Sequence, residues 1–300
     1  MVDGQDKPGP AKWRKWLLPI KALVSLGLLA FLVSRVDWED VRALPSTTPL
    51  LLVCALGINL GALALMAGRW QILLRAATGR SVAYPNLFRY YLVGAFYNNL
   101  LPGTIGGDVL RTKRLASNHD ITLASATRVT ITERVIGLCG VLLLASVTAH
   151  WAPLPPSWEQ AFGSWRGPLT VIAAASSVLL MFALLFTLRR QRLGAGTLAS
   201  VGLLVITAQM ADAIIVLLFF LTMDIGIAPA ALVFAVSASY LAAMVPISLG
   251  GLGVKETVLT ALLLLAGVPM HAAILVPLML TLTRLLTGAV GAITDLRSKT

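Results

Sequence analysis

The chain has 300 residues, of which 57% are hydrophobic and 12% are charged. Soluble domains carry about 25% charged residues, so the composition excludes a soluble globular protein and predicts an all-α integral membrane protein that forms a single polytopic domain. The formal net charge of +11 indicates basic cytoplasmic loops. It does not indicate a nucleic-acid partner, because no long polar stretch is present to form a nucleic-acid-binding domain.

Six apolar segments are long enough to cross about 30 Å of hydrocarbon, which requires roughly 20 residues. They cover residues 17–34, 50–68, 129–150, 168–188, 198–221 and 272–293. The first segment follows a basic head and is followed by no small-residue cleavage site, so it is expected to stay as a transmembrane helix and not to be removed as a signal peptide. Two more apolar regions, 86–112 and 229–267, are each broken near the middle by proline and glycine.

Basic residues indicate which loops face the cytoplasm. They are concentrated in the N-terminal head, in a 69–89 loop that begins with Arg69, at 111–114, at 189–192 and in the C-terminal tail. The six spans alternate with this bias only if each broken region enters and leaves the membrane on one side. We therefore expect two re-entrant helical hairpins of opposite orientation, with the N- and C-termini both cytoplasmic.

The two breaks resemble each other in sequence. LPGTIGGDVLR at 101–111 aligns without gaps to VPISLGGLGVK at 245–255. The alignment matches residues of the same type: Pro102 with Pro246, Gly106 with Gly250, Gly107 with Gly251, and Arg111 with Lys255. Each copy follows two spans and precedes one, so the halves 15–150 and 165–295 are expected to form an inverted repeat. Transporters with this architecture bind their substrate at the repeat interface, near mid-membrane.

The residues of the breaks suit an anion site. Proline stops a helix and paired glycines allow a sharp turn, which leaves backbone N–H groups free to bind an anion at the start of the next half-helix. Arg111 and Lys255 add positive charge about one turn further on. Alternatively, the glycines only allow close helix packing, but packing alone does not require a cation in both copies. Asp108 is expected to cap the first of these half-helices.

Ionisable residues inside a span are costly and indicate function. Glu133 lies within TRVTITERVIGL and needs a cationic partner, either Arg134 or Arg111. Arg284 lies near the middle of the last span, where it must face a carboxylate, a cavity or a phosphate. Its obvious buried partner is Asp212, in which case the pair could be structural.

Glu256 follows Lys255 directly and could pair with it, or with Arg284 instead. The sequence holds no catalytic pattern. GTIGGD lacks the Gly-Lys-Ser/Thr ending of a phosphate-binding loop, no GxSxG elbow occurs, and the three histidines form no metal-binding motif. The chain is therefore not expected to be an enzyme, and we expect neither a cofactor nor a metal.

Three motifs, NNLLPGTIGGDVLR, RVTITERVIGL and PISLGGLGVKET, together resemble the flippase-like family. This is the lysylphosphatidylglycerol synthetase transmembrane region, also found in the membrane part of the multiple peptide resistance factors. The resemblance covers about residues 15 to 295. It implies a multi-pass protein of the cell inner membrane that handles lipids. The sequence holds no soluble aminoacyl-transferase domain, so synthesis of lysyl-lipid is not expected.

The residues and the resemblance predict a protein that binds or translocates an anionic lipid, such as a phospholipid, an aminoacyl-phospholipid or a polyprenyl-phosphate carrier. The residues expected to bind lipid or phosphate are Asn99, Pro102, Gly106, Gly107, Arg111, Arg134, Gly250, Gly251, Lys255 and Arg284. Those expected to balance charge or bind a cationic headgroup are Asp108, Glu133, Asp212 and Glu256. Two alternatives stay open: an ion- or proton-coupled solute transporter, and a non-catalytic accessory subunit that partners a lipid glycosyl- or aminoacyl-transferase.

Overall fold

The computed structural model describes residues 14–42, 44–100, 106–151, 156–189, 194–245 and 247–296. This part of the chain is all-helical and holds no strand. Its helices are α1 (Arg14–Val33), α2 (Trp38–Arg42), α3 (Thr48–Thr78), α4 (Tyr84–Leu100), α5 (Gly106–Asn118), α6 (Leu123–Trp151), α7 (Pro156–Arg189), α8 (Ala195–Thr222), α9 (Pro229–Ala243), α10 (Val254–Leu265) and α11 (Met270–Leu296). The predicted fold class, all-α, is confirmed.

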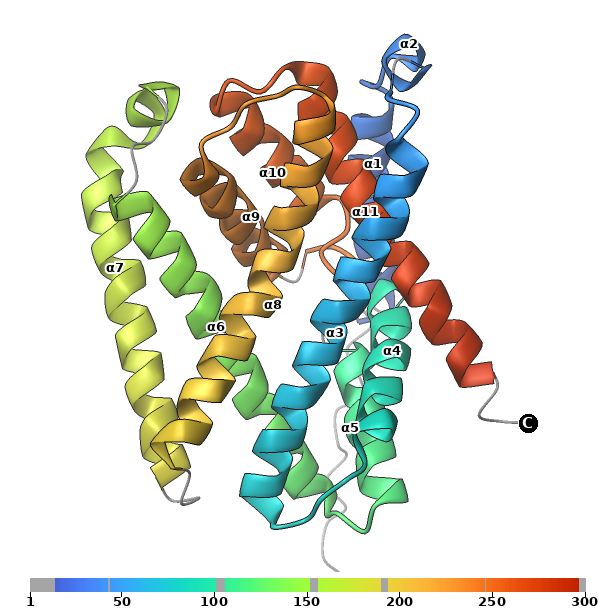
Figure 1. Cartoon of the computed structure of the whole chain (residues 1–300), viewed down its shortest axis with the longest axis vertical. Coiled ribbons are helices and arrows are strands. Elements are labelled where there is room, and N and C mark those ends of the chain that lie inside the picture. The colour runs from blue at the N-terminus through green and yellow to red at the C-terminus, as the bar shows by residue number, and fades with distance from the viewer. Residues whose placement is uncertain are drawn as a thin grey trace, which may run out of the picture.

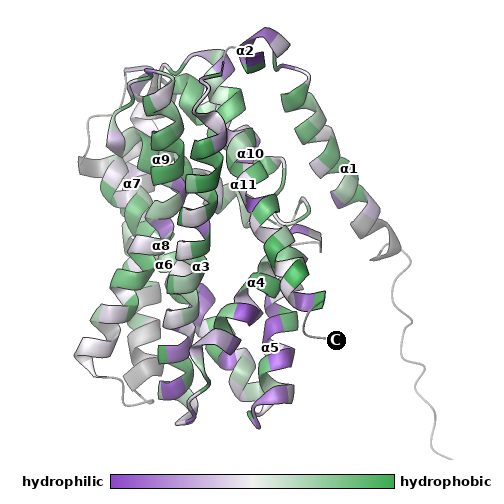
Figure 2. Ribbon diagram, turned by 45° about the vertical axis from the view of Figure 1, so that its right-hand side comes forward, coloured by the Kyte–Doolittle hydropathy of each residue, from purple (hydrophilic) through white to green (hydrophobic). Residues whose placement is uncertain are grey.

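Four of these helices are long and apolar enough to cross a membrane: α3, α6, α8 and α11. The apolar helices Pro19–Val33, which is part of α1, and Pro229–Ala243, which is α9, are shorter. Figure 2 shows apolar residues along most of the long helices and hydrophilic residues gathered on α2 and α5. The chain is therefore a multi-pass membrane protein, and its helices lie where the apolar segments of the sequence predict them.

Each broken region forms two short helices that pack against each other, α4 with α5 and α9 with α10. We call them the first and the second helix pair. In Figure 1 the first pair occupies the lower half of the molecule and the second pair the upper half, so their connected ends point toward each other. These ends are in contact, because a Cβ added to Gly250 would stand 2.4 Å from the carbonyl oxygen of Asn98.

The two pairs belong to a repeated order of elements. The series α3, first pair, α6 is followed by α8, second pair, α11. Contacts between the two series are reciprocal: α4 packs on α11, α9 packs on α6, and α3 packs on α8. Each series also has its own apolar core, one centred on α3, α4 and α6 and the other on α8 to α11. Such reciprocity is expected if a two-fold axis relates the halves.

The matched glycine pairs play different parts in the two copies. Gly250 and Gly251 have φ values of +56° and +83°, which side chains rarely adopt, so the predicted sharp turn is present in the second copy. Gly106 and Gly107 instead open α5 with ordinary helical geometry. A Cβ on Gly107 would lie 2.0 Å from the carbonyl oxygen of Gly94 in α4. The turn prediction is therefore wrong for the first copy, where close helix packing requires the glycine.

The contact between the two pairs can be tested with Gly250→Ala. Gly267 is the control, because its φ of +82° is also positive while nothing lies within 4 Å of an added Cβ. Gly250→Ala is expected to lower the free energy of unfolding by about 1–2 kcal/mol more than Gly267→Ala, since only the former also overpacks its surroundings. Unfolding by SDS titration in mixed micelles measures the difference. Equal losses would mean that the two pairs do not touch at Gly250.

Candidate functional site

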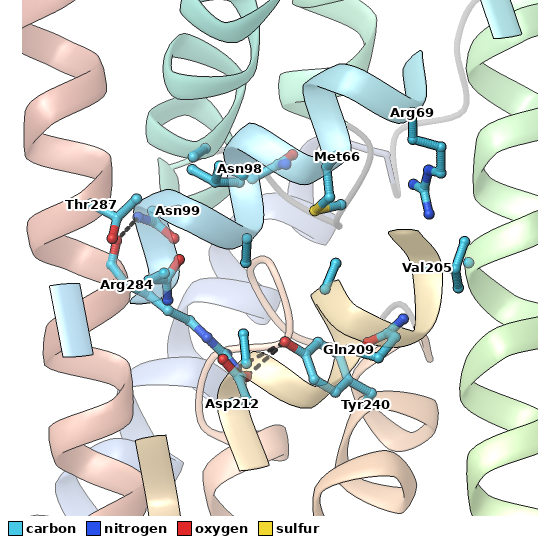
Figure 3. A pocket seen from close by; sticks show the side chains of 17 residues that line it. Met66, Arg69, Asn98, Asn99, Val205, Gln209, Asp212, Tyr240, Arg284 and Thr287 are labelled. Carbon is cyan, nitrogen blue, oxygen red and sulfur yellow. Dashed lines mark hydrogen bonds and ion pairs between the residues drawn. The ribbon is translucent and has the colours of Figure 1, made fainter. Parts of the chain in front are cut away.

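Two adjoining cavities of about 310 and 300 Å³ lie where the helix pairs meet. Arg69, Asn98, Gln209 and Tyr240 line both of them, and Figure 3 shows these side chains around the first. Their described lining holds five cations, Arg69, Arg111, Arg134, Lys255 and Arg284, and three carboxylates, Asp108, Glu133 and Asp212. Most of the predicted charged residues are therefore gathered in one place.

Glu133 of α6 is the centre of one ionic cluster. Its Oε1 accepts a hydrogen bond from Arg69 Nη2 at 2.9 Å and its Oε2 one from Arg111 Nη2 at 2.7 Å. The Tyr91 hydroxyl donates to Oε1 as well, and the Arg111 guanidinium lies 4.1 Å from the centre of the Tyr91 ring. Glu133 is only 1% exposed. Of the two partners predicted for Glu133, Arg111 is thus confirmed, and a second partner comes from α3.

Asp212 of α8 is the centre of the other cluster. Its Oδ2 accepts hydrogen bonds from the Tyr240 hydroxyl at 2.6 Å, from Lys255 Nζ at 2.7 Å and from Arg284 Nη2. Lys255 Nζ also lies 3.3 Å from the centre of the Tyr240 ring. Figure 3 shows Tyr240 and Arg284 converging on Asp212. The predicted pairing of Arg284 with Asp212 is confirmed.

The Glu133 cluster and the Asp212 cluster have the same composition: one carboxylate, two cations and one tyrosine. The first helix of each pair supplies the tyrosine, and the second helix supplies the cation that the sequence alignment matches, Arg111 or Lys255. The long helices before and after each pair supply the remaining cation and the carboxylate, but in opposite order in the two halves. The helix before the pair gives a cation in one half and the carboxylate in the other, Arg69 and Asp212; the helix after it gives Glu133 and Arg284.

Asp108 links the Glu133 cluster to a further cation. Its Oδ1 accepts a hydrogen bond from Arg111 Nε at 2.9 Å, and its Oδ2 one from Arg134 Nε. The cap predicted for Asp108 is supplied by Asn98 instead, whose Oδ1 accepts the Gly107 N–H at 2.8 Å. Asp108 lies within the first turn of α5, so its side chain projects sideways toward α6 and not back over the start of the helix.

Glu256 is bound by the N-cap of its own helix and by a hydroxyl of α11. Its Oε2 accepts the Gly253 N–H at 2.6 Å and its Oε1 the hydroxyl of Thr281, so the predicted pairing with Lys255 or Arg284 is wrong. The cause is position, because a glutamate three residues after the helix start reaches back to the N-cap amide. The N–H groups of Gly107 and Gly253 therefore donate to side chains.

The remaining predicted residues lie close to the cavities or outside the described part. Asn99 lines the first cavity and its Nδ2 donates to the Arg284 carbonyl at 3.3 Å. Gly250 lines the second cavity, whereas Gly251 packs against Ala243 of α9. Pro102 and its repeat partner Pro246 lie outside the described residues.

Arg69 and the two tyrosines, Tyr91 and Tyr240, are site residues that the sequence did not predict. Arg69 was assigned to a cytoplasmic loop, but α3 continues to Thr78 and holds it 4% exposed. The apolar pattern after Arg69 could have indicated that the helix continues. Trp70, Leu73 and Leu74 have helical spacing, and all three are buried.

The site has hydrogen-bonding capacity left over. Arg69 Nε and Arg111 Nη1 are buried and have no hydrogen-bond partner among the described residues. The Arg134 and Arg284 side chains also line the second cavity and are 36% and 23% exposed, so a molecule there can reach them. No group of three or more His, Cys, Asp or Glu in the described part could hold a metal ion. The chemistry available is the binding of an anion by guanidinium groups.

Comparison with known proteins gives one match. A family model described as "Lysylphosphatidylglycerol synthase TM region" matches residues 19–291. No curated protein and no solved structure matches the chain.

Proposed function

Because the chain belongs to the family of the lysylphosphatidylglycerol synthase TM region, we propose that it binds an anionic lipid and moves it between the leaflets of the cell inner membrane. The observation that carries the proposal is the composition of the cavity, where five cations face three carboxylates. A site with surplus buried positive charge needs an anion to balance it, because uncompensated charge is costly away from water.

The apolar part of the cavity favours a lipid over a small solute. Leu63 and Met66 of α3 line both cavities, and Leu138 and Val141 of α6 line the second. A lipid can place its headgroup against the cations and the start of its chains against these side chains. A carrier of a small polar solute would not need this apolar lining. We also assign no catalysis to the site, since its carboxylates are held by cations and its tyrosine hydroxyls donate to those carboxylates.

The proposal includes an arrangement in the membrane. In this arrangement the helices α1, α3, α6, α7, α8 and α11 span the bilayer, and the two helix pairs are re-entrant hairpins that open to opposite faces. An even number of spans places both termini on one side. The basic residues near the open end of the first pair, such as Arg80 and Lys113, make that side cytoplasmic. The halves then form an inverted repeat with the cavity at its interface.

A liposome assay tests the function. Purified protein is reconstituted with fluorescent phosphatidylglycerol, and the fluorescence that dithionite cannot reach reports movement between leaflets. Arg134→Gln and Arg284→Gln are each expected to slow this movement at least about tenfold, the cost of losing roughly one charge-assisted hydrogen bond. Both side chains line the second cavity and are partly exposed, whereas Arg111 and Lys255 are buried in ion pairs, so that their loss would also destabilise the protein.

Arg80→Gln is the control, because Arg80 lies in an exposed ion pair with Asp120 outside the cavity. It should move lipid like the wild type. Normal movement in both cavity variants would contradict a cationic lipid path. If wild-type protein alone moved no lipid, the accessory-subunit alternative would replace the proposal.

A further inference from the structure

We propose that the cavity selects a phosphomonoester headgroup, which carries nearly two negative charges, over a phosphodiester headgroup, which carries one, and over any headgroup with an amine. This inference rests on the proposed function and narrows its substrate to one chemical class. Lipid-linked monophosphates and phosphatidic acid belong to that class.

The first argument is the charge balance. The described lining of the two cavities holds five cations and three carboxylates, so it carries two more positive than negative side chains. Glu256 is not part of this count, because it lines neither cavity and its oxygens accept hydrogen bonds from Gly253 and Thr281. Residues 101–105, which the structure leaves undescribed, carry no ionisable side chain. A phosphomonoester carries a charge of about −1.5 to −2 at pH 7, which matches this surplus.

The second argument is that the carboxylates are engaged. Both oxygens of Asp108 and both oxygens of Glu133 accept hydrogen bonds from arginines. Asp212 receives three donors on one oxygen. An ammonium group entering the cavity would compete with these cations for the carboxylates, and it would add positive charge to a lining that already holds more cations than carboxylates. An aminoacylated or ethanolamine headgroup is therefore disfavoured.

The third argument is the supply of donors. A phosphomonoester offers three acceptor oxygens. Arg69 Nε and Arg111 Nη1 are unpartnered among the described residues, and both side chains are 5% exposed and line the second cavity. Arg284 and the amide of Gln209 border the same space, as Figure 3 shows for the first cavity. Bidentate guanidinium groups suit phosphate oxygens better than point charges do.

Binding measurements on the detergent-solubilised full chain test the proposal. The probes are dioctanoyl phosphatidic acid as the monoester, dioctanoyl phosphatidylglycerol as the diester, dioctanoyl phosphatidylethanolamine as the amine-bearing lipid, and glycerol 3-phosphate as a monoester without acyl chains. At pH 7.5 phosphatidic acid should bind at least about tenfold more tightly than phosphatidylglycerol, and phosphatidylethanolamine should bind least. At pH 5, below the second phosphate pKa of about 6, the preference for the monoester should shrink.

Gln209→Glu is the charge variant. It keeps the shape of a residue that lines both cavities and reduces the surplus to one charge, so the preference for phosphatidic acid over phosphatidylglycerol should fall severalfold. Arg80→Gln should leave the preference unchanged. Phosphatidylglycerol binding as tightly as phosphatidic acid would overturn the monoester selectivity and leave the lipid function intact. Glycerol 3-phosphate binding as tightly as phosphatidic acid, or no binding of any anionic lipid, would overturn the lipid function itself.

Discussion

Replacing Glu133 with alanine is expected to lower the free energy of unfolding by about 3–5 kcal/mol, the cost of breaking a buried ion pair by removing one partner. Glu133 is the only carboxylate that Arg69 contacts among the described residues, at 2.9 Å, and it also holds Arg111 at 2.7 Å. Both arginines are 4% exposed, so each loses a counter-charge in a largely buried position. SDS titration in mixed micelles measures the loss.

Two further variants test whether the loss comes from the buried ion pair. Arg128→Ala removes an exposed charge from the same helix and should change the unfolding free energy by less than about 0.5 kcal/mol. The double variant Glu133→Gln with Arg69→Gln keeps the local charge balance, so it should lose less than the sum of the two single variants. A Glu133→Ala protein as stable as the wild type would mean that the Glu133 cluster does not hold α3, α5 and α6 together.

The sequence predicts the helices and the breaks well because both depend on local composition. Apolar runs require helices in lipid, since every backbone polar group must be satisfied internally, and the breaks stand at proline and glycine. The three motifs also predicted the family that the match over residues 19–291 confirms. The Arg284–Asp212 pair was predictable as well, because two opposite charges inside apolar spans have few other partners.

Long-range pairs were not predictable in the same way. Arg69 looked like the end of a span because an arginine in lipid is costly, yet α3 continues past it since Glu133, far along the chain, offsets the charge. The two clusters also carry opposite charges at equivalent positions of the long helices, so their similarity cannot be recognised from the sequence. A sequence alignment would set Arg69 near Asp212 and find no similarity, although each residue completes an equivalent cluster in its own half.

The matched glycines show most clearly what the sequence alone could not predict. Gly107 and Gly251 align in the sequence, but the first is an α-helical residue facing Gly94 and the second is a left-handed turn residue beside Ala243. A glycine in the sequence indicates only that a side chain is not tolerated at that position. Whether backbone strain or a close neighbour forbids it depends on the packing of another helix.

Gly107→Ala is accordingly expected to force α5 away from α4 and to cost about 3 kcal/mol of unfolding free energy, at the upper end of ordinary overpacking. The added Cβ would stand 2.0 Å from the Gly94 carbonyl oxygen and 2.7 Å from its carbon. These are backbone atoms, so no rotamer change relieves the clash. Because α5 also carries Arg111, its displacement should weaken the 2.7 Å bond to Glu133 and slow lipid movement in liposomes as well.

Gly137→Ala is the matched control for this effect. Gly137 is also helical and lines both cavities, but nothing lies within 4 Å of an added Cβ, so the variant should be neutral or gain up to about 1 kcal/mol from the higher helix propensity of alanine. The difference between the two variants isolates the contact of α4 with α5 from the general effect of glycine replacement. If Gly107→Ala unfolded like Gly137→Ala, α4 and α5 would not pack closely enough to place Arg111 against Glu133, and the cavity would lose one of its walls.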